Sequence, residues 1–203
     1  MIARKVFTGA AYAAGAALVL LAQILPASAD DASVLQTKIR AALRTAKSFV
    51  ETVTIKGSPG HPLGGAATLT VVAPNRFRQF VNGGPGDSDD TIIIGDDVYG
   101  NEGKGWDVLN WTDRLVTDFE GDVFAVRVSS VGPDRTVDGK TVGSFAMIDP
   151  HGATDNDILQ CTYEKSSFRP LACTGIMSTI KYASYDNPTL AIEAPKNARR
   201  TDK

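Results

Sequence analysis

The amino-acid sequence predicts a mainly β protein with helices, in which a curved antiparallel sheet has a helix lying across its hollow. After Phe49 the spacing of apolar residues changes from the 3.6-residue period of a helix to the 2-residue period of strands. About eleven short alternating runs follow, separated by turn residues, which is typical of an antiparallel sandwich or barrel-like sheet. A sheet of this length curls, and a lone amphipathic helix needs an apolar surface to lie on.

Residues 1–29 have the features of a secretory signal peptide. Arg4 and Lys5 precede an apolar stretch over about 10–25, and Ala27-Ser28-Ala29 supplies the small residues that signal peptidase recognises. We expect cleavage after Ala29. The alternative is a retained membrane anchor, because the stretch approaches the length that spans a bilayer, but the cleavage site argues against it.

The mature chain would then be a single domain over 30–195 with a polar, frayed tail at 196–203. Signal removal changes the net charge from -2 to -4, because only basic residues are lost. An acidic chain has no surplus of positive charge with which to neutralise a phosphate backbone, so nucleic acid is not an expected partner. We expect no stable membrane insertion after cleavage.

A first helix is predicted over 34–48 by apolar residues spaced three and four apart, with basic residues on its other side. Thr112 can cap a short second helix over 113–119. Turn residues separate the strands that follow, and Asp138-Gly139 is a strong two-residue hairpin turn. A loop is expected over 83–90, and the predicted strands include 76–81, 92–94, 123–131, 140–148 and 189–192.

The two cysteines are expected to form a structural disulfide. Cys161 and Cys173 lie symmetrically about Ser167 in the segment 158–178, which reads as two extended runs joined by a turn. An antiparallel hairpin centred there places them opposite each other, and export exposes them to an oxidising compartment. A redox-active pair is the weaker alternative, because the C-x-x-C spacing is missing.

Chemistry-bearing motifs are scarce. Both histidines, His61 and His151, lie in turn-forming stretches, and no nucleophile elbow, zinc motif or phosphate loop is present. A triad or metal site of His151 with nearby aspartates is conceivable, but these residues are typical turn formers. The acidic stretch 87–90 lacks the glycine and glutamate of a calcium loop. We therefore expect no catalytic residues, metal or cofactor, and no enzymatic activity.

Three motifs stand out in the mature chain: Ala73-Pro-Asn-Arg-Phe-Arg-Gln-Phe80, the strand-turn-strand Asp90–Gly100 followed by Trp106, and the closing Glu193-Ala-Pro195. Together they resemble the LolA/LolB-type periplasmic lipoprotein-carrier superfamily. The resemblance implies a half-open antiparallel barrel covered by helices, a periplasmic location, and binding of lipid or lipoprotein acyl chains. Ala73 replaces the arginine that fastens the lid of the classical carrier, so the resemblance does not imply that lid.

By this resemblance, Phe77 occupies the family's cavity-lining aromatic position. Residues two apart share a face of a strand, so Gln79 and Val81 should point with Phe77. If the apolar residues of the neighbouring strands and of the helix point toward the same surface, that surface also includes Val53, Ile55, Leu69, Val71, Ile92, Ile94, Ile39 and Leu43. Alternatively, these residues are plain core.

Two functions remain open. One is an exported protein that binds an acyl chain, lipid or lipoprotein in a hydrophobic cavity. The other is a non-enzymatic structural or sensory module of the cell envelope, with a filled core, that recognises another protein.

Overall fold

A computed structural model describes residues 29–56, 64–84, 87–109, 117, 119, 121–149 and 157–200. The predicted signal peptide over 1–29 lies outside these residues except for Ala29. Both histidines, His61 and His151, lie outside them as well. Most of the predicted second helix over 113–119 lies outside them as well, although Thr117 and Phe119 are helical.

The N-terminal helix α1 runs over Ala29–Thr45. It begins earlier than the apolar spacing predicts and ends three residues earlier, because Ser48 already belongs to the first strand. In the last turn of the helix the Thr45 hydroxyl donates a hydrogen bond to the carbonyl oxygen of Ala41 at 2.8 Å.

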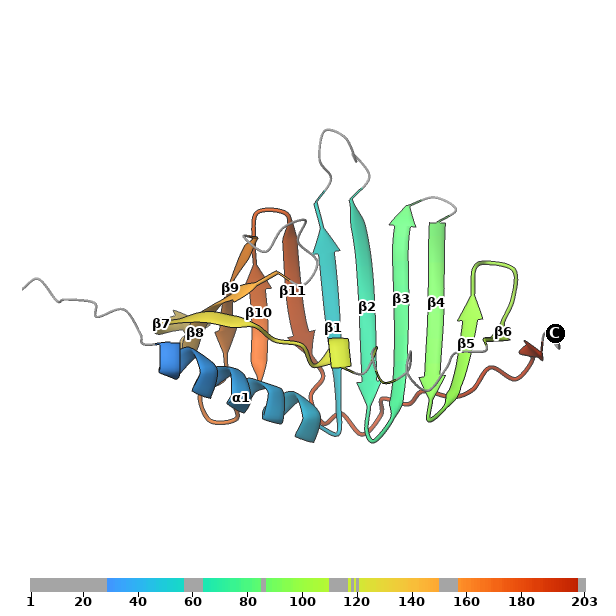
Figure 1. The fold of residues 1–203 in the computed structure, drawn as a ribbon, viewed down its shortest axis with the longest axis horizontal. Coiled ribbons are helices and arrows are strands. Elements are labelled where there is room, and N and C mark those ends of the chain that lie inside the picture. The colour runs from blue at the N-terminus through green and yellow to red at the C-terminus, as the bar shows by residue number, and fades with distance from the viewer. Residues whose placement is uncertain are drawn as a thin grey trace, which may run out of the picture.

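Twelve strands form a single sheet. In chain order they are β1 (Ser48–Ile55), β2 (Gly65–Val72), β3 (Arg76–Gly84), β4 (Asp87–Ile94), β5 (Asp97–Asn101), β6 (Asp107–Leu109), β7 (Val128–Val137), β8 (Lys140–Ile148), β9 (Ile158–Tyr163), β10 (Pro170–Thr174), β11 (Ser178–Ala183) and β12 (Arg199–Arg200). The spatial order is β12-β6-β5-β4-β3-β2-β1-β11-β10-β9-β8-β7 (Figure 1). All neighbours are antiparallel except β12 and β6, which are parallel.

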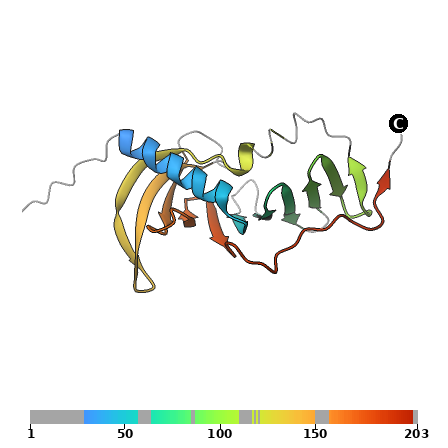
Figure 2. The ribbon, with the colours of Figure 1, turned by 90° about the horizontal axis from the view of Figure 1, so that it is seen from below.

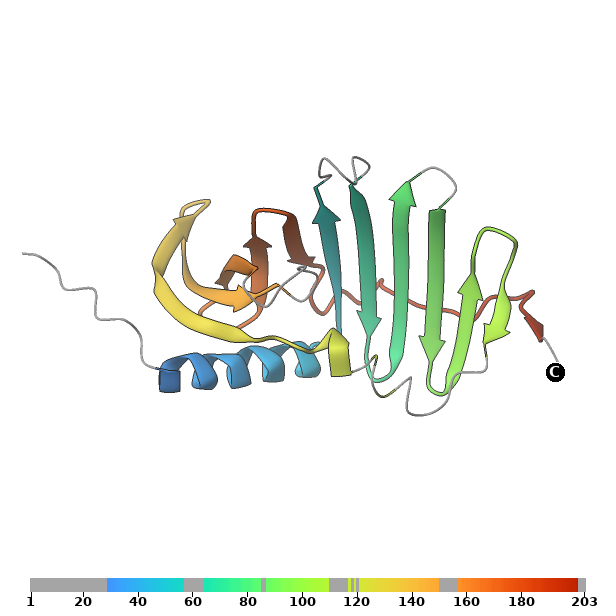
Figure 3. The same ribbon diagram turned by 45° about the horizontal axis from the view of Figure 1, so that its top comes forward.

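The sheet is strongly curved and does not close. The strands β7 to β11, which we call the curled half, bend around α1, whereas β1 to β6, the extended half, continue away from it (Figures 2 and 3). The outermost strands, β12 and β7, lie at opposite ends of the sheet. The half-open, mainly β architecture that the sequence predicts is thus confirmed.

The hollow of the curled half is filled by α1. Ile39 and Leu43 of the helix are 0% and 2% exposed, and they belong to one buried cluster with Phe145, Leu159 and Ile180 of the sheet. The Arg40 guanidinium also donates two hydrogen bonds, at 3.1 and 2.8 Å, to the carbonyl oxygen of Val126 just before β7. Both apolar packing and hydrogen bonding therefore fix the helix in place.

Two hairpins test the turn predictions. Asp138 and Gly139 have φ angles of 49° and 75° and join β7 to β8, as predicted for a two-residue hairpin. The expected loop over 83–90 is wrong for most of its length, because β3 continues to Gly84 and β4 begins at Asp87. Asp90 belongs to the ladder, where its carboxylate accepts two hydrogen bonds from the Arg78 guanidinium.

Two other strand boundaries also differ from the prediction. The predicted strand over 123–131 begins only at Val128, because 121–123 are helical. The predicted strand over 189–192 is absent, since this segment crosses the sheet instead of pairing with it. Arg76 of β3 donates a hydrogen bond at 2.7 Å to the carbonyl oxygen of Ile192.

The C-terminal segment runs along the face of the sheet opposite α1 (Figure 2). Its last described residues, Arg199 and Arg200, form β12 beside β6. The Arg199 guanidinium also forms an ion pair with Asp107 at 2.9 Å. The expectation of a frayed tail is therefore wrong at these two residues.

Candidate functional site

We call the face of the sheet that α1 occupies the inner face. Antiparallel partners share a face, so the register of the strands arranges the inner-face residues of the extended half in rows that cross it. The lower row is Phe49, Val71, Phe77, Ile93 and Val98. The middle row is Glu51, Leu69, Gln79 and Thr91, and it begins with Tyr182 of the adjoining β11. The upper row is Val53, Ala67, Val81 and Asp89, and it begins with Ile180 of β11.

The lower row is closed to solvent. All five of its residues are buried, and Phe77 is 2% exposed. The ring of Phe77 packs edge-on against Phe119 with centroids 5.9 Å apart, and Phe49 packs in the same manner against Phe124. The helical segment before β7 thus covers this row, and Phe77 lies in the core beneath it.

The three isoleucines of β4 do not have the predicted orientation. Ile93 is the partner of Phe77 and lies on the inner face. Ile92 and Ile94 pair with Arg78 and Arg76, so they lie on the outer face. Ile92 is nevertheless only 5% exposed. Both faces of this strand are buried, which is why apolar character does not reveal the face here.

The middle row is the polar part of the inner face. Glu51 and Tyr182 are direct cross-strand partners, both half-buried, and the Tyr182 hydroxyl donates a hydrogen bond to the Glu51 carboxylate. Burial raises the pKa of Glu51 to about 7 despite this hydrogen bond. Burial also raises the pKa of Tyr182 well above its usual value. Across Leu69, Gln79 and Thr91 form a second polar pair.

Solvent exposure increases toward the upper row and beyond. Ala67 and Val81 are half-buried, although their neighbour Val53 is only 4% exposed. Past this row, Ile55 at the end of β1 is exposed. The accessible apolar surface of the inner face therefore lies over the middle of β2 and β3, next to the Glu51 pair.

The exposed end of β1 adjoins an exposed apolar turn. Ile176 and Met177 connect β10 to β11, and Ile176 is 86% exposed. The backbone amide of Lys56 donates a hydrogen bond at 2.7 Å to the carbonyl oxygen of Met177, which fixes the turn beside β1. Apolar side chains are thus exposed at this end of the sheet.

The structure gathers most of the predicted site residues on one surface. Those of β1, β2 and β3 share the inner face with Phe77, as the two-residue period predicts: Val53, Ile55, Leu69, Val71, Gln79 and Val81. Ile39 and Leu43 face the sheet from α1, but they lie in the curled half. The exceptions are Ile92 and Ile94.

Glu51 and Tyr182 are not among the residues that sequence reasoning selects. Glu51 has a visible signal, because a charged residue stands at an inner position of the alternating run Phe49, Glu51, Val53. Tyr182 has none, since only the pairing of β1 with β11, over a hundred residues apart, brings it beside Glu51.

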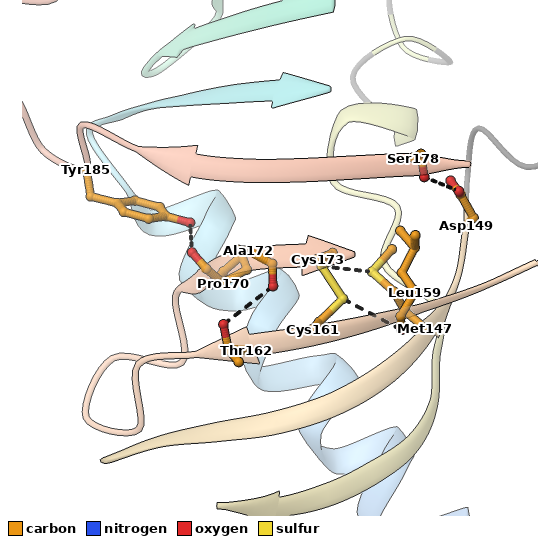
Figure 4. Close-up of a disulfide and its surroundings, with 10 residues drawn as sticks. All are labelled: Met147, Asp149, Leu159, Cys161, Thr162, Pro170, Ala172, Cys173, Ser178 and Tyr185. Atoms are coloured by element: carbon orange, nitrogen blue, oxygen red, sulfur yellow. Dashed lines mark hydrogen bonds between the residues drawn. A yellow bond between two sulfur atoms is a disulfide. The ribbon is translucent and has the colours of Figure 1, made fainter. Parts of the chain in front are cut away.

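The predicted disulfide is confirmed. Cys161 of β9 and Cys173 of β10 are direct partners, with a Cα–Cα distance of 4.0 Å, and their sulfurs are bonded (Figure 4). Both cysteines are buried beside the sulfur of Met147. Nearby, the Ser178 hydroxyl donates a hydrogen bond to the Asp149 carboxylate, which connects β11 to the end of β8 (Figure 4).

The described part of the chain offers no cluster of three or more histidine, cysteine or acidic side chains placed to hold a metal ion. Within the same residues, no helix is both long and apolar enough to cross a membrane.

Comparison with known proteins identifies the fold. No family model and no curated protein sequence matches the chain. Among solved structures, LprF from Mycobacterium bovis is similar at a TM-score of 0.53 and 12% identity, covering 83% of this chain and 99% of that chain. The Mycobacterium tuberculosis lipoprotein LppX is similar at a TM-score of 0.54 and 14% identity, covering 80% of this chain and 99% of that one.

A LolA superfamily protein from Nitrosomonas europaea also matches, at a TM-score of 0.32 and 10% identity, over 79% of this chain and 94% of that chain. At these identities the two mycobacterial likenesses concern the fold alone. The half-open sheet implied by the sequence resemblance is confirmed, and the protein shares its fold with LprF and LppX.

Proposed function

We propose that the protein is an exported, non-enzymatic carrier that binds an acyl chain of a lipid or lipoprotein on the inner face of the extended half. One observation carries this proposal. Leu69, Ala67 and Val81, at the middle of the sheet, are half-buried although the row beside them is fully closed. Apolar side chains left accessible at the centre of a curved sheet provide a surface that an acyl chain can cover.

The energetics suit such a ligand. Burying an acyl chain contributes about 0.8 kcal/mol per CH₂ group, so a surface a few residues wide supports useful affinity without a charged anchor. The sequence of residues 1–29 supports export.

A second function is favoured by a different observation. The hollow of the curled half is filled by α1, whose Ile39 and Leu43 are fully buried. A domain with a filled hollow can serve as a structural or sensory module of the envelope that binds another protein instead of a lipid. Ligand binding is the experimental distinction between the two.

The test begins with the protein expressed with its signal and purified from the periplasm without detergent. Native mass spectrometry should then detect a lipid of defined mass that co-purifies, and intact mass after denaturation should show cleavage after Ala29. Repeated absence of any lipid, together with failure to bind an added fluorescent acyl probe, would contradict the carrier proposal and favour the protein-binding module. Retention of the uncleaved chain would contradict export with a cleaved signal.

A further inference from the structure

The middle row carries two polar pairs at a defined separation. Tyr182 and Glu51 are partners on β11 and β1, and Gln79 and Thr91 are partners on β3 and β4, with Leu69 of β2 between the pairs. Neighbouring strands lie ~4.8 Å apart, so Glu51 and Gln79 are separated by about 10 Å. The row below them is apolar, and the row above is apolar as far as Val81, beyond which its last member is the acidic Asp89 of β4.

The hydrogen-bonding groups of this row remain available. Gln79 is half-buried, so its amide is accessible at the surface of the inner face. The Glu51 carboxyl receives one hydrogen bond, from Tyr182, and a carboxylate can accept several. A ligand that covers these groups displaces their water. A ligand that forms hydrogen bonds with them therefore binds more tightly than one that leaves them buried without partners.

The charge of the inner face points to an uncharged partner. The two arginines of β3, Arg76 and Arg78, lie on the outer face. Described inner-face positions of β1 to β4 include the acidic Glu51 and Asp89 but no lysine or arginine. An anionic head group placed here would meet two acidic side chains without a balancing cation.

We propose that the two polar pairs bind the uncharged polar head of an acyl ligand, a hydroxyl or ester group of the glycerol type, and disfavour a carboxylate or phosphate head. A hydroxyl both donates and accepts, so it can form a hydrogen bond with either the Glu51 carboxyl or the Gln79 amide. The inference rests on the proposed acyl binding, and it adds the class of head group that the same surface selects.

The test compares two ligands that share one acyl chain. Monooleoylglycerol and oleate compete against a fluorescent acyl probe bound to the full exported protein. The wild-type protein should prefer monooleoylglycerol by about tenfold, the size expected for one or two hydrogen bonds. In Gln79→Leu and Glu51→Leu, which act at separate places on the row, the preference should fall to about threefold or less while probe binding persists. The control Thr68→Leu, on the outer face of β2, should keep the wild-type preference.

The outcomes separate this inference from the proposed function. Equal affinity of the wild-type protein for the two ligands, or full preference in both variants, overturns the head-group selection while acyl binding stands. Binding of neither ligand overturns the proposed function, and the inference with it. Thermal unfolding of each variant checks that it is folded, and if one variant fails to fold, the preference measured in the other decides the result.

Discussion

Replacing Glu51 by glutamine should stabilise the protein, and the gain should depend on pH. Burial raises the pKa of Glu51 from 4.5 to about 7, and desolvation is the larger of its two causes. Below the unfolded pKa of such an acid, the carboxyl is protonated in both states and the free energy of unfolding is at its full value. As the pH rises from the unfolded pKa through the folded pKa, the unfolded chain ionises more readily than the folded protein, so the free energy of unfolding falls. Because of Glu51, the free energy of unfolding of the wild-type protein should therefore fall between about pH 4.5 and 7.

The magnitude follows from the size of the shift. At 1.36 kcal/mol per pKa unit, ionising Glu51 in the folded state costs about 3 kcal/mol at most, because solvent reaches part of the side chain. Glutamine keeps the shape and the hydrogen-bonding capacity but cannot ionise. Glu51→Gln should thus be more stable than wild type at pH 8 by about 2 kcal/mol, and nearly equal to it at pH 4.

Urea denaturation followed by circular dichroism at pH 4 and pH 8 measures this difference. Glu193→Gln is a matched control, because Glu193 is exposed in the C-terminal segment and its replacement should leave the free energy of unfolding unchanged. Equal or lower stability of Glu51→Gln at pH 8 would refute the reasoning. The same gain at both pH values would show that ionisation is not its cause.

Three further predictions concern the packing of the sheet. Replacing both Cys161 and Cys173 by alanine should lower the free energy of unfolding by about 3 kcal/mol, because the unfolded chain gains the entropy that the short disulfide loop removes. Denaturant titration measures this loss, and an unchanged free energy of unfolding would contradict the stabilising role of the disulfide. Phe77→Ala should cost about 4 kcal/mol, since the ring is buried on the inner face, and a cost below about 1 kcal/mol would mean that it is not core. Gly143→Ala should cost about 2 kcal/mol because its methyl group would collide with the ring of Tyr163; an unchanged unfolding temperature would contradict that contact.

Where a single strand carries strict alternation, the sequence suffices to assign its faces. Phe77, Gln79 and Val81 share the inner face as predicted, because Arg76 and Arg78 on either side of Phe77 mark the other face. The run Ile92-Ile93-Ile94 contains no such mark. Both of its faces are covered, so only the register with β3 shows that Ile93 is the partner of Phe77.

The remaining features that the sequence does not predict depend on contacts between segments that are far apart in the chain. Residues 189–192 alternate like a strand, but the C-terminal segment crosses the sheet, where the guanidinium of Arg76 binds the Ile192 carbonyl. The Glu51–Tyr182 pair likewise requires β1 to lie beside β11. By contrast, the hairpin of Cys161 and Cys173 is local and symmetric, and it is predicted correctly.

The central claim, that the inner face of the extended half binds an acyl chain, is tested most directly by placing a charge on each face of one strand. Val81 lies on the inner face of β3, and its neighbour Phe80 lies on the outer face, 40% exposed. Titration of a fluorescent acyl probe into both glutamate variants should show at least tenfold weaker binding for Val81→Glu and wild-type affinity for Phe80→Glu. Unchanged affinity in Val81→Glu, or an equal loss in both variants, would contradict the claim.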